Sequence, residues 1–421
     1  MNQTKYKCDV LVCGAGCAGL GAALAAARGG AETILIERAG FAGGIITCVG
    51  LPFFDGIAHI SDGSIMNRGI GFELFARMTG LDEKTTHLET HNPIINNTER
   101  FKLLTDEMLL AEGDRMKLLY HSVVADVKVS RDRIEKVFVA NKAGLVEINP
   151  GMVVDCTGDA DVAFFADVPT EKKSELQPMT LHFRLGNVHL KPDSRQKCRA
   201  ALEHAHERGD LPMFYGPGIM TNYGINEVYM HATRVPADGS DPEDLTRAEI
   251  QGRKDSWAIY EAWKKDVPGF EDSYFMMNYP YIGVRETRRI VGHYVLSEKD
   301  IVDTKSFDDS IATGCWYLDQ HPNRATSGGA QDVKKIQPDP YDIPYRSLVA
   351  QEVENLLVAG RCHSATQLAA SSTRVTVTAM AMGEAAGTAA AMASRKKISS
   401  IELKGTDVRA ELEIRGAGPV G

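Results

Sequence analysis

The sequence predicts an α/β protein built around a parallel β-sheet, and three stretches predict strands of that sheet. In each stretch an apolar run ends in a turn of glycine or polar residues. The runs are VLVC, from Val10 to Cys13, MVVD, from Met152 to Asp155, and NLLVAG, from Asn355 to Gly360. The length of 421 residues allows two or three domains, because one domain usually holds roughly 100 to 200 residues.

The first stretch, CDVLVCGAGCAGLGAALAAARGGAETILIER, predicts a complete strand, helix and strand unit. Gly14, Gly16 and Gly19 allow a tight turn, a close approach of the backbone to a diphosphate, and close packing of the helix on the strand. Glu37 follows Gly14 by 23 residues, where an acid can bond ribose hydroxyls. The N–H groups at the helix N-terminus would face the phosphates. This pattern predicts a dinucleotide cofactor, either NAD or FAD.

Two later stretches continue the pattern. INPGMVVDCTGDADVAFFADV leads a strand into Asp155, Thr157 and Gly158, and VENLLVAGRCHSATQLAASSTRVTVTAMAMGEAAG leads another into Gly360, a polar turn and a helix of small residues. Either could be an ordinary strand and turn of a parallel sheet. The helical window from Val375 to Ala393 has the length of a membrane span, but it lacks large apolar residues and predicts a closely packed buried helix.

Charge and cysteine content exclude several classes of partner. The net charge is −9, with no block of lysine or arginine, so we expect neither a nucleic-acid partner nor a membrane partner. The N-terminus has no signal-peptide pattern, which predicts a cytoplasmic protein. The eight cysteines are scattered without a CxxC pair, so we expect no metal site and no disulfide framework. Cys13 and Cys17 are interpreted as small apolar fillers.

Several motifs together resemble those of the FAD-dependent oxidoreductases of the glutathione reductase type, in particular the bacterial family called simply FAD-dependent oxidoreductase. The likeness extends over nearly the whole chain. It rests on GFAGGIIT, NNTERFKLLTDEML, VVDCTGDADVA, YIGVRETRRIVGHYVL, YDIPYRSLV, NLLVAGRCHSAT, STRVTVTAMAMGEAAGTAAA and TDVRAELEIRGAG. The resemblance implies a Rossmann-like FAD-binding domain with an inserted, mixed-sheet substrate domain. The expected limits are 1–168 and 344–421 for the FAD-binding domain, with a tail helix, and 169–343 for the insertion.

The resemblance also implies which residues contact a non-covalently bound FAD. The glycine turn would contact the diphosphate, Glu37 and Arg38 the adenosine end, and Val124 the adenine through its backbone. Thr157 and Gly158 would close over the adenosine, and Gly43 and Gly44 would pass close to the flavin. Gly360 and Arg361 would reach the ribityl chain, and the helix starting near Arg374 would point its N-terminus at the N1/O2 edge of the flavin. These residues are Gly14, Ala15, Gly16, Cys17, Ala18, Gly19, Glu37, Arg38, Gly43, Gly44, Val124, Thr157, Gly158, Gly360, Arg361, Arg374 and Val375. Many relatives outside the subgroup have an acid after the glycine corresponding to Gly360. This chain has Arg361 at that position, so the residue that usually accepts hydrogen bonds from the ribityl hydroxyls is missing there.

The inserted segment contains the candidate residues on the substrate side. PMTLHFRLGNV predicts a strand, RAEIQGRKDSWAIYEAWKKDVPGF an amphipathic helix, and DQHPNRATSGGAQDVKKIQPDPYD a loop. In GVRETRRIVG, strand alternation would send Arg285 and Arg289 to one face and Arg288 to the other. An inward arginine could clamp a carboxylate or stabilise an enolate; alternatively, it could pair with Glu286 or Asp303.

A histidine is the expected base. In CWYLDQHP, Asp319 and His321 would project together from an extended segment, and a histidine oriented by a carboxylate can accept a proton. The family has a similar Asp-x-His. His182 and His363 are further candidates, although a lone histidine on a strand is more often a satisfied core residue. Cys48 is a single thiol that could lie near the flavin or simply pack in the core.

Together these features predict an FAD-dependent oxidoreductase, a dehydrogenase or oxidase, acting on an alcohol, amine, sugar or hydroxy acid by hydride transfer to flavin N5. Arg285 would orient the substrate, His321 would act as base, and Asp319 would hold the imidazole. No second glycine turn of this type is present, so electrons come from the substrate or from a separate donor. The partners are a small polar substrate and an unidentified electron acceptor, and a homo-oligomer is possible. The alternatives are a fumarate-reductase-like reductase of an activated C=C bond, with arginine as proton donor, and an FAD-containing scaffold.

Overall fold

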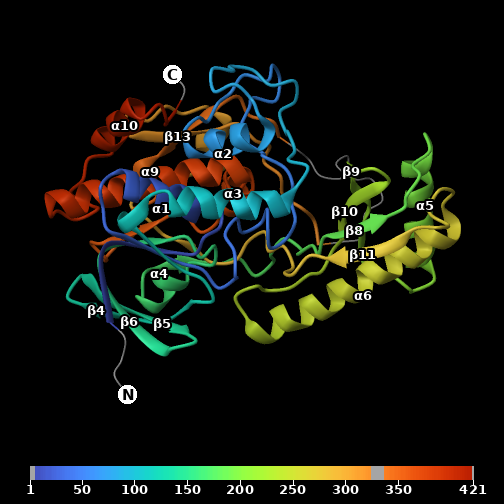
Figure 1. Ribbon diagram of the computed structural model, residues 1–421, viewed down its shortest axis with the longest axis horizontal. Coiled ribbons are helices and arrows are strands. Elements are labelled where there is room, and N and C mark those ends of the chain that lie inside the picture. The colour runs from blue at the N-terminus through green and yellow to red at the C-terminus, as the bar shows by residue number, and fades with distance from the viewer. Residues whose placement is uncertain (1–4, 324–335, 420–421) are drawn as a thin grey trace.

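The computed structural model of the protein describes residues 5–323 and 336–419. Figure 1 shows a larger part, which contains both ends of the described chain, and a smaller part formed by the middle of the sequence. The loop predicted from Asp319 to Asp342 falls partly on residues 324–335, which lie outside the described residues.

The larger part is built on a sheet of seven strands, and its α/β class with parallel strands confirms the predicted fold. The strands are β1 (Lys5–Cys13), β2 (Thr33–Ile36), β3 (Met116–Leu119), β4 (Val123–Ser130), β5 (Arg133–Asn141), β6 (Gly144–Asp155) and β15 (Leu356–Val358). Their order is β3-β2-β1-β6-β5-β4, and β15 also pairs with β6. All pairs among β3, β2, β1, β6 and β15 are parallel, whereas β4, β5 and β6 are antiparallel to their neighbours in the meander they form.

Strand β6 has two different neighbours along one of its edges. Its first half, from Gly144 to Ile148, pairs with β5, and its last three residues, Val153–Asp155, pair with β15. Its other edge pairs with β1 along most of its length. Two segments far apart in the sequence, β1 and β15, are thereby joined through one strand.

Two small-residue helices, α1 (Cys17–Arg28) and α9 (Thr376–Lys396), pack closely against each other beside this sheet (Figure 1). Glycines make the close approach possible, because a Cβ on Gly383 would overlap the carbonyl oxygen of Ala18, and one on Gly387 would overlap that of Ala22. The helix predicted from Val375 to Ala393 is therefore a buried core helix. No helix within the described residues is long and apolar enough to cross a membrane.

The carboxyl group of Glu384, in the middle of α9, is buried and accepts a hydrogen bond of 2.9 Å from the backbone N–H of Ile70. Ile70 is the first residue of α2 (Ile70–Thr79), whose N-cap, Gly69, offers no side chain. The carboxyl group thus takes the place of a helix cap. Burial raises the pKa of Glu384 from its ordinary value of 4.5 to about 7.

We expect Glu384→Gln to weaken the pH dependence of stability. Because the pKa of Glu384 is higher in the folded state, the folded protein holds an extra proton between pH 4.5 and about 7, and stability is lost as pH rises through that window. Glutamine can accept the same hydrogen bond without titrating. The free energy of unfolding should therefore decrease from about pH 5 to pH 8 in both proteins. The decrease should be smaller in the variant than in the wild type, by roughly 1 to 3 kcal/mol.

Urea unfolding at several pH values measures this difference. Glu413→Gln is the control, because Glu413 is an exposed residue paired with Arg409. Equal pH slopes for wild type and Glu384→Gln would contradict the assignment.

Other helices and short strands surround the main sheet. They are α3 (Thr98–Leu110), η1 (Gly113–Arg115), α4 (Asp161–Phe165), β7 (Thr170–Glu171), β12 (Arg289–Ile290), α7 (Glu298–Val302), β13 (Ser310–Gly314), β14 (Tyr341–Pro344), η3 (Tyr345–Ser347), α8 (Gln367–Thr373) and α10 (Gly405–Ile414). Residues of β13 and β14 belong to the same hydrophobic core as α1 and α9. The end of segment 169–343 therefore packs with the larger part, and the predicted domain limits stay a prediction.

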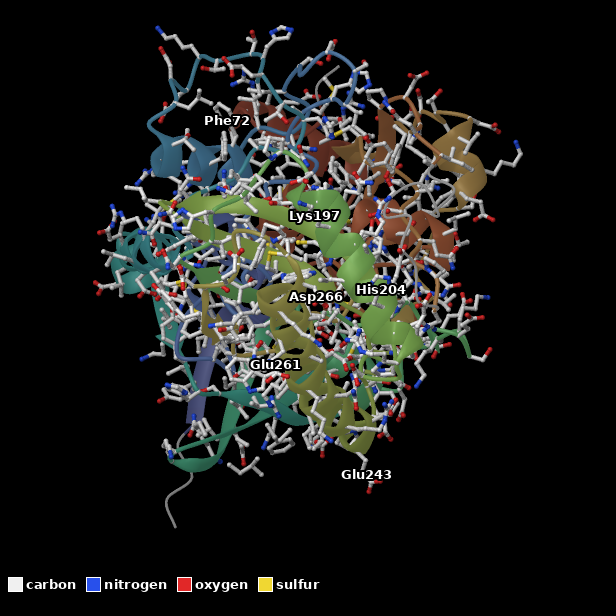
Figure 2. All side chains as sticks on the ribbon, turned by 90° about the vertical axis from the view of Figure 1, so that its right-hand side faces the viewer. Phe72, Lys197, His204, Glu243, Glu261 and Asp266 are labelled. Atoms are coloured by element: carbon white, nitrogen blue, oxygen red, sulfur yellow. The ribbon has the colours of Figure 1, made fainter. Side chains whose placement is uncertain are left out.

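The smaller part is an antiparallel sheet covered by two helices. Its strands are β8 (Phe183–Gly186), β9 (Phe214–Gly224), β10 (Glu227–Thr233) and β11 (Tyr274–Asn278), in the order β11-β8-β10-β9, and its helices are α5 (Ser194–Glu207) and α6 (Pro242–Asp266). Figure 2 shows both helices on the face turned to the viewer, with charged residues such as Lys197 and Glu261 labelled on them. Trp263 anchors α6 in the core and donates a hydrogen bond to the Cys198 carbonyl.

The strand predicted around Arg285 is mostly absent, which corrects the expectation of alternating faces. Only Arg289 and Ile290 form strand β12, and residues 285–288 have irregular backbone. The three arginines consequently enter three different environments, and Arg285 does not share a face with Arg289.

Candidate functional site

A cavity of ≈ 680 Å³ lies at the carboxyl ends of the parallel strands. Turns after β1, β2, β6 and β15 contribute to its wall, and this edge of an open α/β sheet is where such folds bind ligands. The opposite wall comes from α6 and from the segment around Tyr281. The sequence predicts α6 as an amphipathic helix, but its pattern does not say which surface the helix covers.

The glycine turn between β1 and α1 has the geometry that the motif predicts. Gly14 has a φ of +96°, and a Cβ there would lie 2.6 Å from the carbonyl oxygen of Cys156. A Cβ on Gly19 would overlap the carbonyl oxygen of Gly14. Helix α1 begins with Gly16 as N-cap and without a side-chain cap, so its first N–H groups remain available for an anion.

Glu37, directly after β2, is buried at the same wall. One carboxylate oxygen accepts a hydrogen bond of 2.7 Å from the Ala15 N–H, and the other accepts one of 2.8 Å from the Ala39 N–H. These bonds tie the glycine turn to the end of β2. Each carboxylate oxygen keeps a second lone pair, so Glu37 can also accept hydrogen bonds from a ribose.

We expect Glu37→Gln to lower the affinity for FAD by at least about tenfold, since the glutamine NH₂ group would face a backbone N–H on one side. Fluorescence titration of the apoprotein with FAD measures this affinity. Glu32→Gln, at an exposed position directly before β2, should leave the affinity unchanged. Unchanged FAD affinity in Glu37→Gln would remove Glu37 from the cofactor site.

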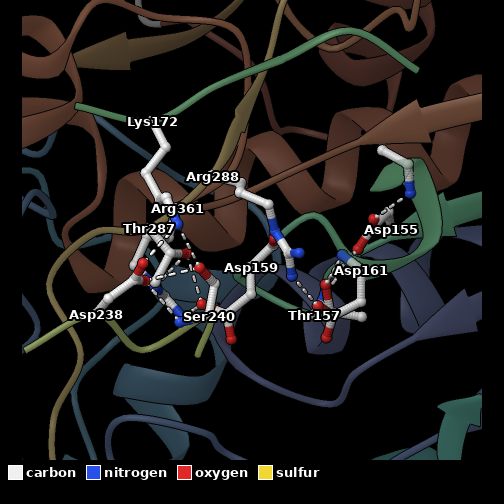
Figure 3. A network of polar contacts seen from close by, with 11 residues as sticks. Asp155, Thr157, Asp159, Asp161, Lys172, Asp238, Ser240, Thr287, Arg288 and Arg361 are labelled. Carbon is white, nitrogen blue, oxygen red and sulfur yellow. Dashed lines mark hydrogen bonds and ion pairs between the residues drawn. The ribbon is translucent and has the colours of Figure 1, made fainter. Parts of the chain in front are cut away.

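A polar network closes another side of the cavity (Figure 3). Buried Asp155, at the end of β6, accepts hydrogen bonds from the N–H and hydroxyl of Thr157 and from the Ala163 N–H. These bonds fix the turn that holds Gly158, whose φ is +83°. Burial raises the pKa of Asp155.

The same network explains how the chain accommodates Arg361. The guanidinium lies 2.9 Å from the Asp159 carboxylate and donates to the Thr287 hydroxyl, which itself donates to Asp159 at 2.6 Å (Figure 3). Asp159 and Arg361 both line the cavity. A carboxylate is therefore present next to the turn of Gly360, but Asp159 supplies it from a different loop.

The N-terminus of α9 also borders the cavity. Val375 is its N-cap and provides no side-chain cap, and the neighbouring Arg374, Thr376 and Ala379 line the wall. The Arg374 Nη2 group donates to the carbonyl oxygen of Asp319 at 3.3 Å. Its Nε–H is buried and has no partner among the described residues.

Most of the predicted cofactor residues line this cavity. They are Gly14, Gly16, Cys17, Ala18, Glu37, Arg38, Gly44, Val124, Thr157, Gly158, Gly360, Arg361 and Arg374. Ala15, Gly19, Gly43 and Val375 are not among the lining residues. Ala15 and Gly43 stand behind the wall, where the Gly43 N–H donates to the Ala15 carbonyl at 2.8 Å. Two uncapped helix N-termini, a glycine cradle and a buried carboxylate fit an FAD molecule.

The cysteines fit the interpretation as fillers. All eight are free and buried. Burial raises the pKa of Cys17 to about 12 and that of Cys48 to about 11, and it raises the pKa of Cys13 well above its ordinary value. These thiols stay protonated at neutral pH, which disfavours nucleophilic or redox roles. Cys17 and Cys48 nevertheless line the cavity.

Arg285 lies at the cavity wall nearest the smaller part, and it is buried. Its guanidinium donates to the Pro178 carbonyl, to the Thr180 hydroxyl at 2.9 Å, and to Nε2 of His231 at 2.8 Å. Burial, followed by the charges of Arg234 and Arg374, lowers the pKa of Arg285. The other two arginines of the motif are structural, since Arg288 pairs with Asp161 at 2.6 Å and Arg289 lies 3.6 Å from Glu286.

The predicted pair of Asp319 and His321 comes together, with 3.4 Å between a carboxylate oxygen and Nε2. On the other side of the ring, Nδ1 faces Nη2 of Arg234 at 3.4 Å. Burial, followed by the charge of Arg285, lowers the pKa of His321 to about 3, so the ring is neutral. Both ring nitrogens face protein groups, and the base role of His321 stays a prediction.

His182 and His363 occupy positions behind the site. His182 is buried, its Nδ1 lies 2.6 Å from the Tyr229 hydroxyl, and neither residue is at the cavity wall. His363 is hydrogen-bonded to Thr373 at 2.7 Å. His182 fits the alternative of a satisfied core histidine, whereas His363 is a core histidine whose buried Nδ1 has no partner among the described residues.

Arg234 and His231, on or just after strand β10, are the site residues that sequence reasoning missed. His231 holds Arg285, and Arg234 lies with its guanidinium 4.0 Å from the centre of the Tyr215 ring. The signal in the sequence was a histidine and an arginine within the largely apolar segment VYMHATRVP. Among the described residues, no group of three or more histidines, cysteines or acids could hold a metal ion.

A family model and several solved structures match this chain. The family described as FAD dependent oxidoreductase matches residues 9–412. No curated protein matches the chain. Among solved structures, a geranylgeranyl bacteriochlorophyll reductase-like protein from Thermoplasma acidophilum has 12% identity and a TM-score of 0.49 over 98% of this chain and 84% of its own. A p-nitrophenol 4-monooxygenase from Pseudomonas putida has 9% identity and a TM-score of 0.48 over 94% and 82%.

Proposed function

Because this chain belongs to the FAD dependent oxidoreductase family, we propose that it binds FAD non-covalently and oxidises a small polar substrate at the Arg285 end of its cavity. The chain is thus an oxidoreductase that uses FAD, rather than a scaffold. The observation that carries the proposal is the continuous wall of one cavity, which runs from the glycine turn at Gly14 to Arg285 and Arg374. A cofactor held at the glycine turn and a substrate held at Arg285 would share this space.

Within the family, we propose the glutathione reductase type. The support is local: the glycine turn, the acid Glu37 after β2, and the N-terminus of α9 at the cavity form the arrangement that this type implies. The eight buried free thiols fit a reducing compartment, and the proposal places the protein in the cytoplasm.

Bound FAD supplies the acceptor for the hydride that the substrate loses. Arg285 would orient the substrate through hydrogen bonds from its guanidinium group. The hydrogen bonds of this group to Thr180 and His231 fix its position. His321 would take the hydroxyl or amine proton at Nδ1, the nitrogen that now faces Arg234, once the substrate exchanges with that contact. Asp319 would stabilise the resulting imidazolium through Nε2.

Anaerobic mixing of the purified yellow protein with alcohols, amines, sugars and hydroxy acids tests the proposal, with the visible flavin band as the readout. Bleaching by one class is the expected result and names that class. A flavin that dithionite bleaches but no member of the panel bleaches would contradict oxidation of a small polar substrate.

One observation favours the reverse chemistry, reduction of an activated C=C bond, as a second candidate. The lowered pKa of Arg285 makes its guanidinium a better proton donor than an ordinary arginine. Rapid reoxidation of the dithionite-reduced enzyme by an unsaturated acid, and not by oxygen or a quinone, would favour this candidate. Equal reoxidation by oxygen would count against it.

A further inference from the structure

Three arginine side chains gather beside the Arg285 end of the cavity without an ion-pair partner. Arg288, Arg289 and Arg361 pair with carboxylates nearby, but Arg234, Arg285 and Arg374 have no such partner among the described residues. Arg234 is 1% exposed and Arg285 is 7% exposed. Buried guanidiniums are ordinarily paired, because an unpaired buried charge is costly.

The partners that these arginines do have are neutral. Arg234 donates to the Thr180 hydroxyl at 2.7 Å and to the Thr233 carbonyl at 2.9 Å, in addition to its contact with His321. Arg285 donates to a carbonyl, a hydroxyl and the ring of His231. Arg374 donates to a carbonyl, and its buried Nε–H has no partner in the described part of the chain.

The surrounding titratable groups do not balance this charge. Burial lowers the pKa of His182, His231 and His321, so these rings are neutral and add no charge. Within residues 5–323 and 336–419, Asp319 is the one carboxylate whose charge acts on all three arginines.

Two further carboxylates, Asp55 and Glu286, act on Arg374. Glu286 already accepts hydrogen bonds from the Gln177 N–H and from Gln367, and it faces Arg289. The charge of the cluster of Arg234, Arg285 and Arg374 is therefore compensated only in part by the residues that the structure describes.

We propose that this arginine cluster binds a carboxylate group of the substrate, so that the substrate is a small organic acid. The inference rests on the proposed function and narrows it: among alcohols, amines, sugars and hydroxy acids, it selects the members that carry a carboxylate. A guanidinium fork matches the two oxygens of a carboxylate. Arg285 and Arg374 both reach the cavity wall, and Arg234 lies behind them, where its charge adds to the attraction.

Two other anions could bind to the arginine cluster, namely a phosphate group of the substrate and the diphosphate of FAD itself. The following titration distinguishes both of them from a carboxylate. Isothermal titration calorimetry of the holoenzyme, in a chloride-free buffer of low ionic strength, compares oxalate and acetate with acetamide and with inorganic phosphate. None of these probes needs to be oxidised, so the test does not depend on turnover.

In the wild type, acetate should bind at least about tenfold more tightly than its neutral isostere acetamide, and oxalate more tightly than phosphate. In Arg285→Gln, the affinity for oxalate should fall by at least about tenfold. In Arg285→Lys, the affinity for oxalate should fall less, because lysine keeps the positive charge. The matched control is Arg247→Gln, which removes one positive charge from an exposed residue of α6 paired with Asp244. It should leave oxalate affinity unchanged.

Three outcomes would overturn the proposal. They are equal affinity of the wild type for acetate and acetamide, tighter binding of phosphate than of oxalate, and a loss of FAD without a change in oxalate affinity in Arg285→Gln. The wild-type comparison decides the question even if the variants fail to fold. If acids bind but none bleaches the flavin, the anion site stands and the proposed oxidation fails. If a neutral alcohol bleaches the flavin and no acid binds, the proposed oxidation stands and the carboxylate site is excluded.

Discussion

Gly383→Ala should destabilise the protein by about 3 kcal/mol or more and abolish FAD binding. In an isolated helix this change would be favourable by up to about 1 kcal/mol, because alanine has the higher helix propensity. Here the new Cβ would overlap the carbonyl oxygen of Ala18, which belongs to the backbone of α1 and cannot rotate away. Helices α1 and α9 would have to separate, and both present their N-termini to the cavity.

Thermal unfolding and the flavin content of the purified variant measure the effect. Gly71→Ala, in α2, is the control, because a Cβ there would first meet side-chain atoms of Val377 and Met380 at 3.0 Å and beyond. Those side chains can adjust, so the control should keep its FAD and lose little stability. A Gly383→Ala protein that is as stable as Gly71→Ala would show that α1 and α9 are not held in backbone contact.

His321→Ala should slow reduction of the flavin by roughly 10²-fold or more with whichever compound bleaches the wild type, since this is the usual contribution of a general base. The low pKa of His321, about 3, keeps the ring neutral from pH 8 down to about pH 5, so acidification over this range should not remove the base. Anaerobic stopped-flow mixing measures the rate directly.

The exposed His204 on α5, labelled in Figure 2, provides the control. His204→Ala should reduce its flavin at the wild-type rate. Added imidazole should restore part of the rate in His321→Ala if the lost function is proton transfer. A variant that reduces its flavin as fast as the wild type would exclude His321 as the base and leave Arg285 as the group that handles the proton.

The cofactor half of the site could be predicted from the sequence because its determinants are local. Gly14, Gly16 and Glu37 lie within one strand, helix and strand unit, and the turn geometry that demands glycine is encoded over a few residues. The later turns at Thr157 and Gly360 follow from the rule that parallel strands end at the same edge of a sheet. All of these residues line the cavity.

The substrate half could be predicted only in part, as with Arg285 and the pair of Asp319 and His321, because it is assembled from distant segments. Arg234, Arg285 and Arg374 come from the end of a strand, an irregular loop and a helix C-cap. Periodicity assigns faces only where the backbone is regular, and around Arg285 it is not. The replacement of an acid by Arg361 likewise has its explanation in Asp159, more than two hundred positions earlier in the chain.

The contact between α1 and α9 also bears on the order in which the protein can fold during synthesis. Helix α1 is complete once Arg28 has been made, yet the helix that covers it runs from Thr376 to Lys396, and β15 joins β6 only from Leu356. Domains otherwise tend to fold from their N-terminus as they leave the ribosome. While residues 29–375 are being made, the face of α1 that packs on α9 therefore lacks its native partner. We expect chaperones to bind the nascent chain until α9 has been made.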